Sequence, residues 1–439
     1  MNKQKQNNKL VPELRFPEFE NDGEWEEIRL IDVTDKNTKW SFIGGPFGSN
    51  LKSSDYVTNN KGIRVIQLQN IGDGQFNNSS KIFTSEQKAN ELLSNNIYPG
   101  DIIMSKMGDP VGRACFIPNF HDRHVMCSDG IRLVVDEKKY DKYFIYTLIN
   151  SNSFRSIVER TATGSTRKRI GLDNLKNLMM TVPKELEEQK KIADCLCSLD
   201  DLIGLAIEKL NFLKTHKKGL LQQLFPAEGE TVPKLRFPEF ENDGDWEITE
   251  LGKCLFQQPE YGIGAPAVPF SENLPTYLRI TDISEDGHFL YSKKVSVERE
   301  VTEDNYLDEG DIVFARTGAS VGKSYKYRIK DGRLVFAGFL IRVKPDPKKL
   351  NSELLFQFVF SEEYWNWVKI TSPRSGQPGI NSKEYSLMPL ILPSALIEQK
   401  KIANCLSSLD DLIEAQREKI EVLKEHKKGL MQQLFPIKN

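Results

Sequence analysis

The chain has 439 residues, of which 39% are hydrophobic and 28% are charged. This balance is typical of a folded soluble protein and excludes a membrane-embedded or intrinsically disordered chain. The length exceeds what one hydrophobic core usually fills, so we expect two or three domains. The formal net charge of −2 argues against a uniformly basic DNA-binding protein, because phosphates are neutralised by Lys and Arg, but it is compatible with a local basic surface.

The chain shows no targeting signal, membrane span or metal motif. No apolar run approaches the roughly 20 residues that span a bilayer. Met1–Lys9 is polar and charged with no apolar stretch behind it, unlike a signal peptide, so we expect a cytoplasmic protein with no membrane partner. The six cysteines are scattered and form no disulfide framework. Cys115, His121, His124 and Cys127 are close in sequence, but their spacing matches no common zinc pattern, so we predict no metal and no cofactor in this chain.

In chain order, the first recognisable element is a segment that returns later almost unchanged. Three segments repeat in the same order with one or two substitutions each, which indicates an internal duplication. The sequences between them are alike only in outline. A nearly identical frame therefore holds two dissimilar modules. The two copies of the frame should bind two copies of the same partner, whereas the two modules should bind different targets. The repeated pairs are residues 11–26 with 232–247, 188–203 with 398–413, and 216–226 with 426–436.

The duplication divides the chain into six predicted segments, which fall into frame and module. The frame comprises an amino-terminal segment, a central helical spacer, a repeated frame segment and a carboxy-terminal helical spacer. The two inserts are predicted to be globular, and we call them the first and second modules. The segments are 1–26 (frame), 27–187 (first module), 188–226 (spacer), 227–247 (frame), 248–397 (second module) and 398–439 (spacer).

Each module mixes apolar runs typical of strands with stretches typical of helices, punctuated by Gly and Pro. Ile63–Leu68 and Leu334–Ile341 are predicted strands, and Tyr143–Val158 and Ser352–Val368 are predicted helices. We therefore predict an α+β protein with two globular α/β modules.

The loops of both modules carry candidate DNA contacts. The Gly164–Ile170 loop combines small residues with three cations, and small residues let backbone N–H groups approach an anion such as a phosphate. Gln67, Gln69 and Arg279 are the residue types that read base edges. Any one basic loop is more often solvated surface than a binding site. The candidate DNA-binding residues are Ser49, Lys52, Gln67, Gln69, Lys106, Arg113, Gly164, Ser165, Thr166, Arg167, Lys168 and Arg169 in the first module, and Tyr261, Arg279, Arg316, Lys323, Arg374, Ser375, Gly376 and Gln377 in the second.

Both spacers show a sustained heptad pattern with apolar positions alternating four and three residues apart, which predicts two long helices that pair as a coiled coil. Antiparallel pairing is favoured because it produces a pseudo-twofold repeat with a module at each end. About 38 residues make a helix of roughly 57 Å, which corresponds to one to two turns of B-DNA. Lys217 and Lys427 fall on the seam, where a lysine commonly sets register. The other predicted seam residues are Ile192, Leu196, Leu199, Ile203, Leu210, Leu213, Ile402, Leu406, Leu409, Ile413, Ile420 and Leu423.

Motifs for catalysis are missing from the sequence. There is no Gly-x-x-x-x-Gly-Lys-Ser/Thr phosphate loop and no Asn/Asp-Pro-Pro-Tyr/Phe motif of amino-methyltransferases. We therefore expect a non-catalytic chain whose chemistry comes from other subunits.

With these motifs in order, the chain resembles the specificity subunit of type I restriction–modification enzymes over nearly its whole length. In that family Glu-Gln-x-x-Ile opens each long helix, as Glu188–Ile192 and Glu398–Ile402 do here. The Gly-Asp-Ile element of these domains, followed by two spaced glycines, occurs once in each module. Its residues are Gly100, Asp101, Ile102, Gly108 and Gly112, and Gly310, Asp311, Ile312, Gly318 and Gly322.

The resemblance implies that the two modules are target-recognition domains 1 and 2 of a bacterial DNA-binding subunit. Such a subunit recognises a bipartite asymmetric site in double-stranded DNA, one half per module with an unread gap. It also implies two methyltransferase subunits, which bring S-adenosylmethionine and methylate adenine, and two motor-nuclease restriction subunits, which use ATP and magnesium. The second module departs from the first by having Pro378-Gly379 in place of Lys168-Arg169.

Two other interpretations stay open at this point. The chain could be a self-contained DNA-modifying enzyme with an unrecognised site. It could also be a duplicated protein-interaction scaffold that does not bind DNA.

Overall fold

The computed structural model describes residues 10–58 and 61–436. The amino-terminal stretch Met1–Lys9 lies outside the described residues. By internal packing the chain divides into two units. Unit 1 combines the residues up to Ala206 with those from Lys419 onward, and unit 2 is Ile207–Glu418.

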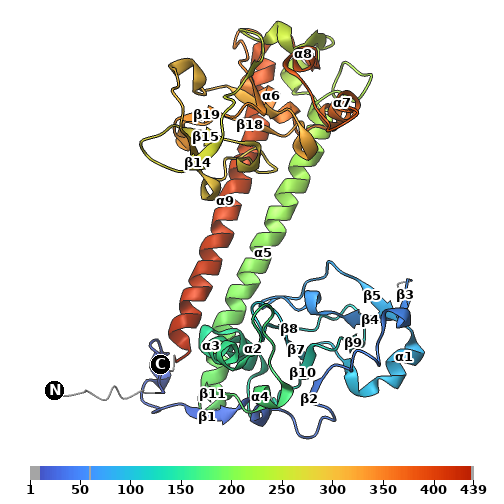
Figure 1. Ribbon diagram of the computed structural model, residues 1–439, viewed down its shortest axis with the longest axis vertical. Coiled ribbons are helices and arrows are strands. Elements are labelled where there is room, and N and C mark those ends of the chain that lie inside the picture. The colour runs from blue at the N-terminus through green and yellow to red at the C-terminus, as the bar shows by residue number, and fades with distance from the viewer. Residues whose placement is uncertain (1–9, 59–60, 437–439) are drawn as a thin grey trace, which may run out of the picture. The chain divides into compact units, whose positions relative to one another are not determined.

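Unit 1 contains the first module, with a four-stranded sheet in the order β2-β10-β7-β8 and a five-stranded sheet in the order β3-β5-β4-β9-β6. A two-stranded sheet, β1-β11, closes the module by joining its beginning to its end. The elements are β1 (Glu26–Arg29), β2 (Phe42–Gly44), β3 (Tyr56–Val57), β4 (Ile63–Ile66), β5 (Ile82–Thr84), α1 (Glu86–Glu91), β6 (Asn96–Ile97), β7 (Ile102–Ser105), β8 (Ala114–Phe116), β9 (His124–Met126), β10 (Gly130–Leu133), α2 (Lys142–Asn150), α3 (Asn152–Thr161), α4 (Leu172–Lys176) and β11 (Met179–Val182) (Figure 1).

Unit 2 repeats this topology except that its second sheet has four strands, with no strand corresponding to β6. Its sheets have the orders β13-β20-β17-β18, β14-β16-β15-β19 and β12-β21. A parallel strand pair also matches between the described parts of the two modules, β4 with β9 and β15 with β19. The elements are β12 (Glu247–Glu250), β13 (Glu260–Tyr261), β14 (Ala267–Pro269), β15 (Thr276–Leu278), β16 (Val295–Val297), β17 (Ile312–Ala315), β18 (Ser324–Lys326), β19 (Leu334–Phe336), β20 (Leu340–Val343), α6 (Ser352–Phe358), α7 (Glu362–Thr371), α8 (Ser382–Ser386) and β21 (Pro389–Leu392).

The main core of each unit lies between the four-stranded sheet and the helices that follow it. In unit 1, buried side chains of β7 and β10 pack with those of α2 and α3 and with the start of α5 (Leu186–Leu224). The turn that leads into β8 depends on Gly112, which has φ +77° and would place a Cβ 2.8 Å from Val158 of α3. Gly322 repeats this contact with Val368 of α7. The last glycine of the repeated Gly-Asp-Ile element is therefore required by packing against α3 or α7.

Three predicted elements of the modules are wrong in detail. The helix predicted over Tyr143–Val158 is two helices, because the Ser151 side chain accepts a hydrogen bond from the Phe154 backbone N–H and caps α3. Ser361 caps α7 in the same way and divides the helix predicted over Ser352–Val368. Serine at such a position offers the backbone a partner that competes with helix continuation. The apolar run Leu334–Ile341 is two strands, β19 and β20, which belong to different sheets.

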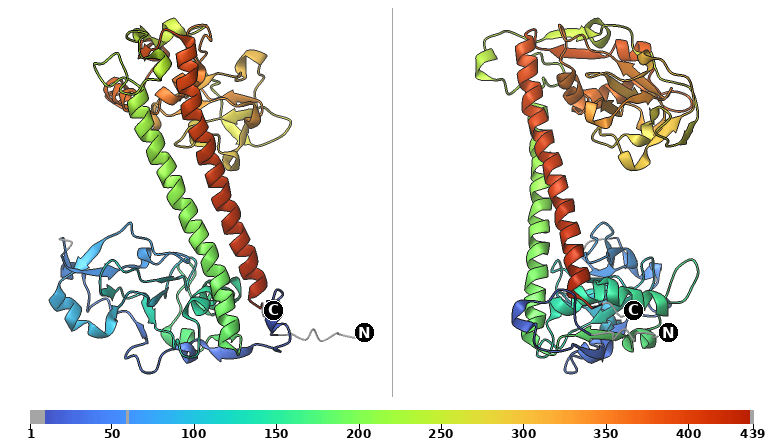
Figure 2. Two further views of the ribbon diagram at one scale, coloured as in Figure 1. Left: turned by 180° about the vertical axis from the view of Figure 1, so that it is seen from behind. Right: turned by 90° about the vertical axis from the view of Figure 1, so that its left-hand side faces the viewer.

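The long helices α5 and α9 (Leu396–Leu434) have 39 residues each. Within unit 1, Leu434 packs in the core with Ile192 and Leu196, while Lys427 pairs with Asp200 at 2.6 Å. The α5 and α9 segments of this unit therefore run antiparallel (Figures 1 and 2). None of the twelve predicted apolar seam residues is exposed.

Unit 2 contains the same contacts with the helices exchanged. Leu224 shares a core with Ile402 and Leu406, and Lys217 pairs with Asp410 at 2.6 Å. The predicted antiparallel pairing of two long helices is confirmed within each unit. Each seam lysine forms an ion pair with an aspartate of the facing helix. These ion pairs fix the register of the two helices, the role expected of a lysine on the seam.

The start of each long helix is tied to a repeated frame segment by a buried network. Glu188 is 1% exposed and accepts hydrogen bonds from Arg15 at 2.8 and 2.7 Å and from the Trp25 indole at 3.1 Å. Gln189 donates to the Pro183 carbonyl and accepts from the Asp141 backbone N–H. The repeated Glu-Gln pair therefore joins the helix to both frame and module.

The second copy of the network has the same partners. Glu398 accepts from Arg236 at 2.8 and 2.9 Å and from Trp246 at 3.3 Å. Gln399 donates to the Pro393 and Lys349 carbonyls. The contacts of Glu398 thus match those of Glu188, while Gln399 makes one further hydrogen bond, to the Lys349 carbonyl.

Among the described residues, no helix is long and apolar enough to cross a membrane. Within the same ranges, no group of three or more His, Cys, Asp or Glu side chains could hold a metal ion, the Cys115–Cys127 stretch included.

Candidate nucleic-acid interface

The first module has an open cleft of about 710 Å³ that gathers residues from four segments. These are the turn after β4, the loop after β7, the turn after β9 and the Gly164–Ile170 loop. Five of the candidates predicted from the sequence lie together in this cleft. Its lining residues are Gln67, Leu68, Gln69, Gly108, Asp109, Arg113, Cys127, Ser128, Asp129, Thr166 and Arg167.

The turn after β4 is held from beneath by a buried amide. Asn70 is fully buried and accepts a hydrogen bond from the Gln67 backbone N–H at 2.9 Å. Its amide nitrogen donates to the Asn77 carbonyl at 2.8 Å. The Gln69 side chain donates to the Gln67 side chain at 2.9 Å. The turn thus presents two coupled carboxamides, which are groups that can both donate and accept hydrogen bonds.

The Gly164–Ile170 loop is anchored at its base by backbone hydrogen bonds. Thr163 and Arg169 exchange two of them, at 2.8 and 2.9 Å, and the Gly108 N–H donates to the Lys168 carbonyl at 3.1 Å. Gly164 has φ +110°, and a Cβ there would lie 2.7 Å from the Arg167 carbonyl oxygen. The sequence therefore builds a fixed, exposed loop at the rim of the cleft.

The three cations of this loop are not equivalent. Lys168 pairs with Glu159, and Arg169 pairs with Asp129 at 3.0 Å. Arg167 forms no ion pair with any residue that the structure describes. Arg167 is therefore the cation of the loop that is most available to an external anion.

Two further cations lie near this cleft. Lys106 donates to the Ser128 carbonyl at 3.1 Å and is partly buried. Arg113 is also partly buried, and its Nε has no hydrogen-bond partner within the described ranges.

The second module has a corresponding cleft of about 880 Å³. Its backbone framework is the same, because Gly318 N–H donates to the Pro378 carbonyl and Ile380 N–H donates to the Arg316 carbonyl. Asp282 holds the turn after β15 by accepting from the Arg279 backbone N–H at 2.9 Å, as Asn70 does in the first module. The lining residues are Ile263, Gly264, Ala265, Pro266, Ala267, Tyr277, Arg279, Ile280, Thr281, Thr317, Ala337, Gly338 and Phe339.

Most predicted cations of the second module are occupied within the module. Arg279 forms two hydrogen bonds with Asp282, at 2.9 and 2.8 Å. Arg374 forms two with Glu384, at 2.5 and 2.6 Å. The Arg316 guanidinium lies 4.6 Å from the centre of the Tyr261 ring.

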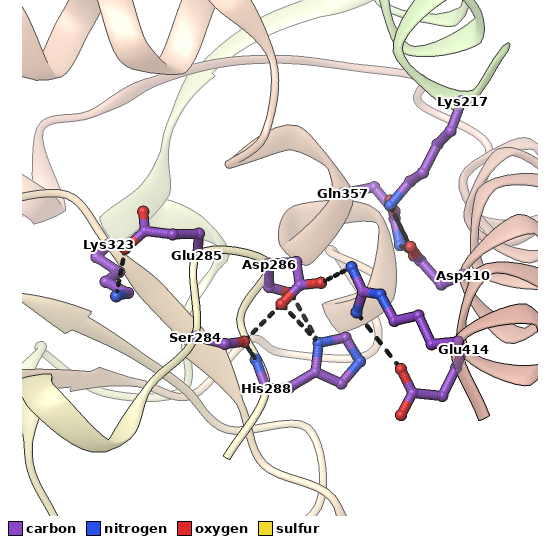
Figure 3. A network of polar contacts seen from close by, with 10 residues as sticks. Lys217, Ser284, Glu285, Asp286, His288, Lys323, Gln357, Asp410 and Glu414 are labelled. Carbon is purple, nitrogen blue, oxygen red and sulfur yellow. Dashed lines mark hydrogen bonds and ion pairs between the residues drawn. The ribbon is translucent and has the colours of Figure 1, made fainter. Parts of the chain in front are cut away.

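Lys323 pairs with Glu285 at 2.8 Å, beside a network that joins the module to α9 (Figure 3). In this network Asp286 pairs with Arg417 of α9. Hydrogen bonds from His288, Ser284 and Arg417 lower the pKa of Asp286 below its usual range. The loop that contains Glu285 and Asp286 is therefore attached to α9 by the Asp286–Arg417 ion pair.

Some predicted candidates lie outside the two clefts. Ser49 and Lys52 are exposed on the turn before β3, and Ser375, Gly376 and Gln377 are exposed in the loop before α8. Sequence reasoning missed Asp129 and Phe339, which occupy corresponding turns after β9 and β19 and line the clefts. Their positions relative to the repeated Gly-Asp-Ile elements are equal, and this spacing was the signal that could have identified them.

The match with known families decides the class of the protein. Residues 23–215 and 274–425 match the type I restriction modification DNA specificity domain. The chain belongs to this family. It is a type I specificity subunit, a non-catalytic component of a restriction system, and this excludes the self-contained enzyme.

Relatives of the whole chain support the same class. The type I restriction enzyme MjaVIII specificity subunit of Methanocaldococcus jannaschii is 27% identical over 396 residues, covering 84% of each chain. The type I S subunit structure from M. genitalium covers 98% of this chain and 100% of its own, with a TM-score of 0.59 and 14% identity. A chain from a structure of type I R-M complex assembly covers 94% and 97%, with a TM-score of 0.55 and 16% identity. These two structures show that the fold is shared.

Proposed function

We propose that this specificity subunit recognises a bipartite, asymmetric site in double-stranded DNA, with one half bound by each module and an unread gap between them. The observation that carries the proposal is the pair of clefts at equivalent positions. Their backbone frameworks are held by matching hydrogen bonds, while their side chains differ. Two similar scaffolds with different linings are suited to reading two different base sequences.

The frame supports a second part of the proposal, the docking of partner subunits in two copies. The networks around Glu188 and Glu398 are equal in residues and contacts, so a partner that binds one frame can bind the other. The partners are two adenine-N6 methyltransferase subunits, which carry S-adenosylmethionine, and two motor-nuclease subunits, which use ATP and magnesium. The six-segment division of the chain into frame and modules is part of this proposal.

The first experiment identifies the site. Methylated adenines are sequenced in a host that carries this chain and its methyltransferase partner. We expect one motif with two unlike specified halves, a fixed unspecified gap and one methylated adenine in each half. A continuous motif, or no sequence preference, would contradict the proposal.

Exchange of one module tests whether each module recognises one half of the DNA site. Replacing residues 27–187 by the module of an unrelated specificity subunit should change one half of the motif and leave the other half and the gap unchanged. A change in both halves would mean that the modules do not read independently.

A further inference from the structure

The two clefts differ in character at two pairs of corresponding positions. In the first module Asp129 lies in the turn after β9 and pairs with Arg169. In the second module the corresponding residues are Phe339, in the turn after β19, and Gly379, which meets Thr317 as Arg169 meets Met107. An ion pair at the edge of the first cleft is thus replaced by an aromatic side chain and a residue without one.

Phe339 is 63% exposed although it is a large apolar side chain. The neighbouring lining of the second cleft is also largely apolar, with Ala267 exposed and Ile263 and Ala265 partly exposed. The first cleft presents instead two glutamines, two arginines and two aspartates. Contiguous exposed apolar surface in a polar setting marks a contact with another molecule.

The proposed function restricts what that molecule can present. In the major groove of DNA, thymine carries the one apolar group, its C5-methyl, while the other base edges offer hydrogen-bond donors and acceptors. We infer that the second module recognises thymine methyl groups with Phe339 and the adjoining apolar wall, whereas the first module reads hydrogen-bonding base edges with Gln67 and Gln69. This inference rests on the proposed function.

The test removes the methyl groups from the DNA and leaves the protein intact. Duplexes carrying the motif found by methylation sequencing are prepared with uracil in place of thymine, in one half-site at a time. Binding by the full chain with its methyltransferase partner is measured at fixed salt. Because burial of one methyl group changes affinity by about fourfold, we expect about a fourfold loss for each contacted thymine of the second half-site. Uracil in the first half-site should change affinity by less than about twofold, since hydrogen-bonding edges are the same in both bases.

A protein variant connects the effect to Phe339. Phe339→Ala should weaken binding to the thymine duplex and reduce the thymine-to-uracil affinity ratio of the second half-site to about one. Phe256→Ala is the matched control, because Phe256 belongs to the same module, is 67% exposed and does not line the cleft. That variant should keep the ratio of the unmodified chain.

The outcomes separate this inference from the proposed function. If the cognate duplex binds no better than a scrambled one, the proposed function and this inference fail together. If cognate preference is present but uracil in the second half-site has no effect on binding, the inference alone is overturned. Loss of binding by Phe339→Ala with an unchanged uracil effect would assign Phe339 another role, such as wedging between bases, and would also overturn it.

Discussion

At the residue scale, Glu188 and Glu398 show why the repeated segments are so similar. Each carboxylate is 1% exposed and serves an arginine and a tryptophan from a distant frame segment. Removal of one partner from a buried ion pair leaves an uncompensated charge, which costs far more than loss of an exposed pair. The identical residues are thus needed for the stability of the frame.

Glu188→Ala should lower the free energy of unfolding of unit 1 by about 3 kcal/mol, because the Arg15 guanidinium would stay buried without its partner. Glu398→Ala should do the same in unit 2 through Arg236. Glu187→Ala, at an exposed neighbouring position, should change stability by less than about 0.5 kcal/mol. Calorimetry of the full chain checks this, and equal melting curves for Glu188→Ala and Glu187→Ala would refute it.

His124 predicts a pH dependence of unit 1. Burial, with nearby His121 and Arg64, lowers the pKa of His124 to about 4 in the folded chain. The unfolded chain binds this proton near pH 6.5, so stability is fully present above that pH and is lost as the pH falls from about 6.5 to 4. The loss at pH 5 is about 2 kcal/mol. His124→Leu should remove this contribution, which a comparison of denaturant midpoints at pH 7 and pH 5 measures.

Five predicted residues of the first cleft came together because residue type is informative for glutamine, arginine and small loop residues. Phe339 was missed for a physical reason. It lies in the apolar run Leu334–Ile341, and such a run has no periodicity that distinguishes a buried strand position from an exposed turn. Tertiary pairing of β19 and β20 in different sheets turns the chain between them and exposes this side chain.

At the element scale, the Gly164–Ile170 loop makes a prediction that separates its cations. Arg167→Ala should reduce the magnitude of the slope of log affinity against log salt by about 0.9, the effect of one phosphate contact. Lys168→Ala should reduce it less, because Lys168 is already paired with Glu159. Titrations of DNA binding at several salt concentrations distinguish the two. An unchanged slope for both variants would mean that this loop makes no phosphate contact.

The long helices were predictable from sequence because a heptad pattern sustained over nearly forty residues is typical of paired helices and of little else. The shorter helices were not, since Ser151 and Ser361 end one helix and begin the next by local hydrogen bonds. Cap residues act over three or four positions, whereas the apolar pattern continues across them. Element type was therefore easier to predict than element boundaries.

At the scale of the whole molecule, the chain combines two nearly identical copies of the frame with two modules whose clefts differ. The frame contacts Lys217–Asp410 and Lys427–Asp200 repeat with the roles of α5 and α9 exchanged, while the clefts carry different side chains. The duplication was evident in the sequence, since three segments return nearly unchanged. The equivalence of the clefts required the fold, because corresponding lining positions carry different residues, such as Gln69 and Thr281.

We propose that one repeated frame holds two modules, each of which recognises its own half-site independently of the other. The most direct test is a chain that carries residues 27–187 in both module positions, expressed with the methyltransferase partner. Sequencing of methylated adenines should then give a symmetric motif. Its two halves are the first half-site and the inverted repeat of that half-site, separated by the gap. An unchanged asymmetric motif, or a motif absent from both parent half-sites, would contradict the independence of the two readers.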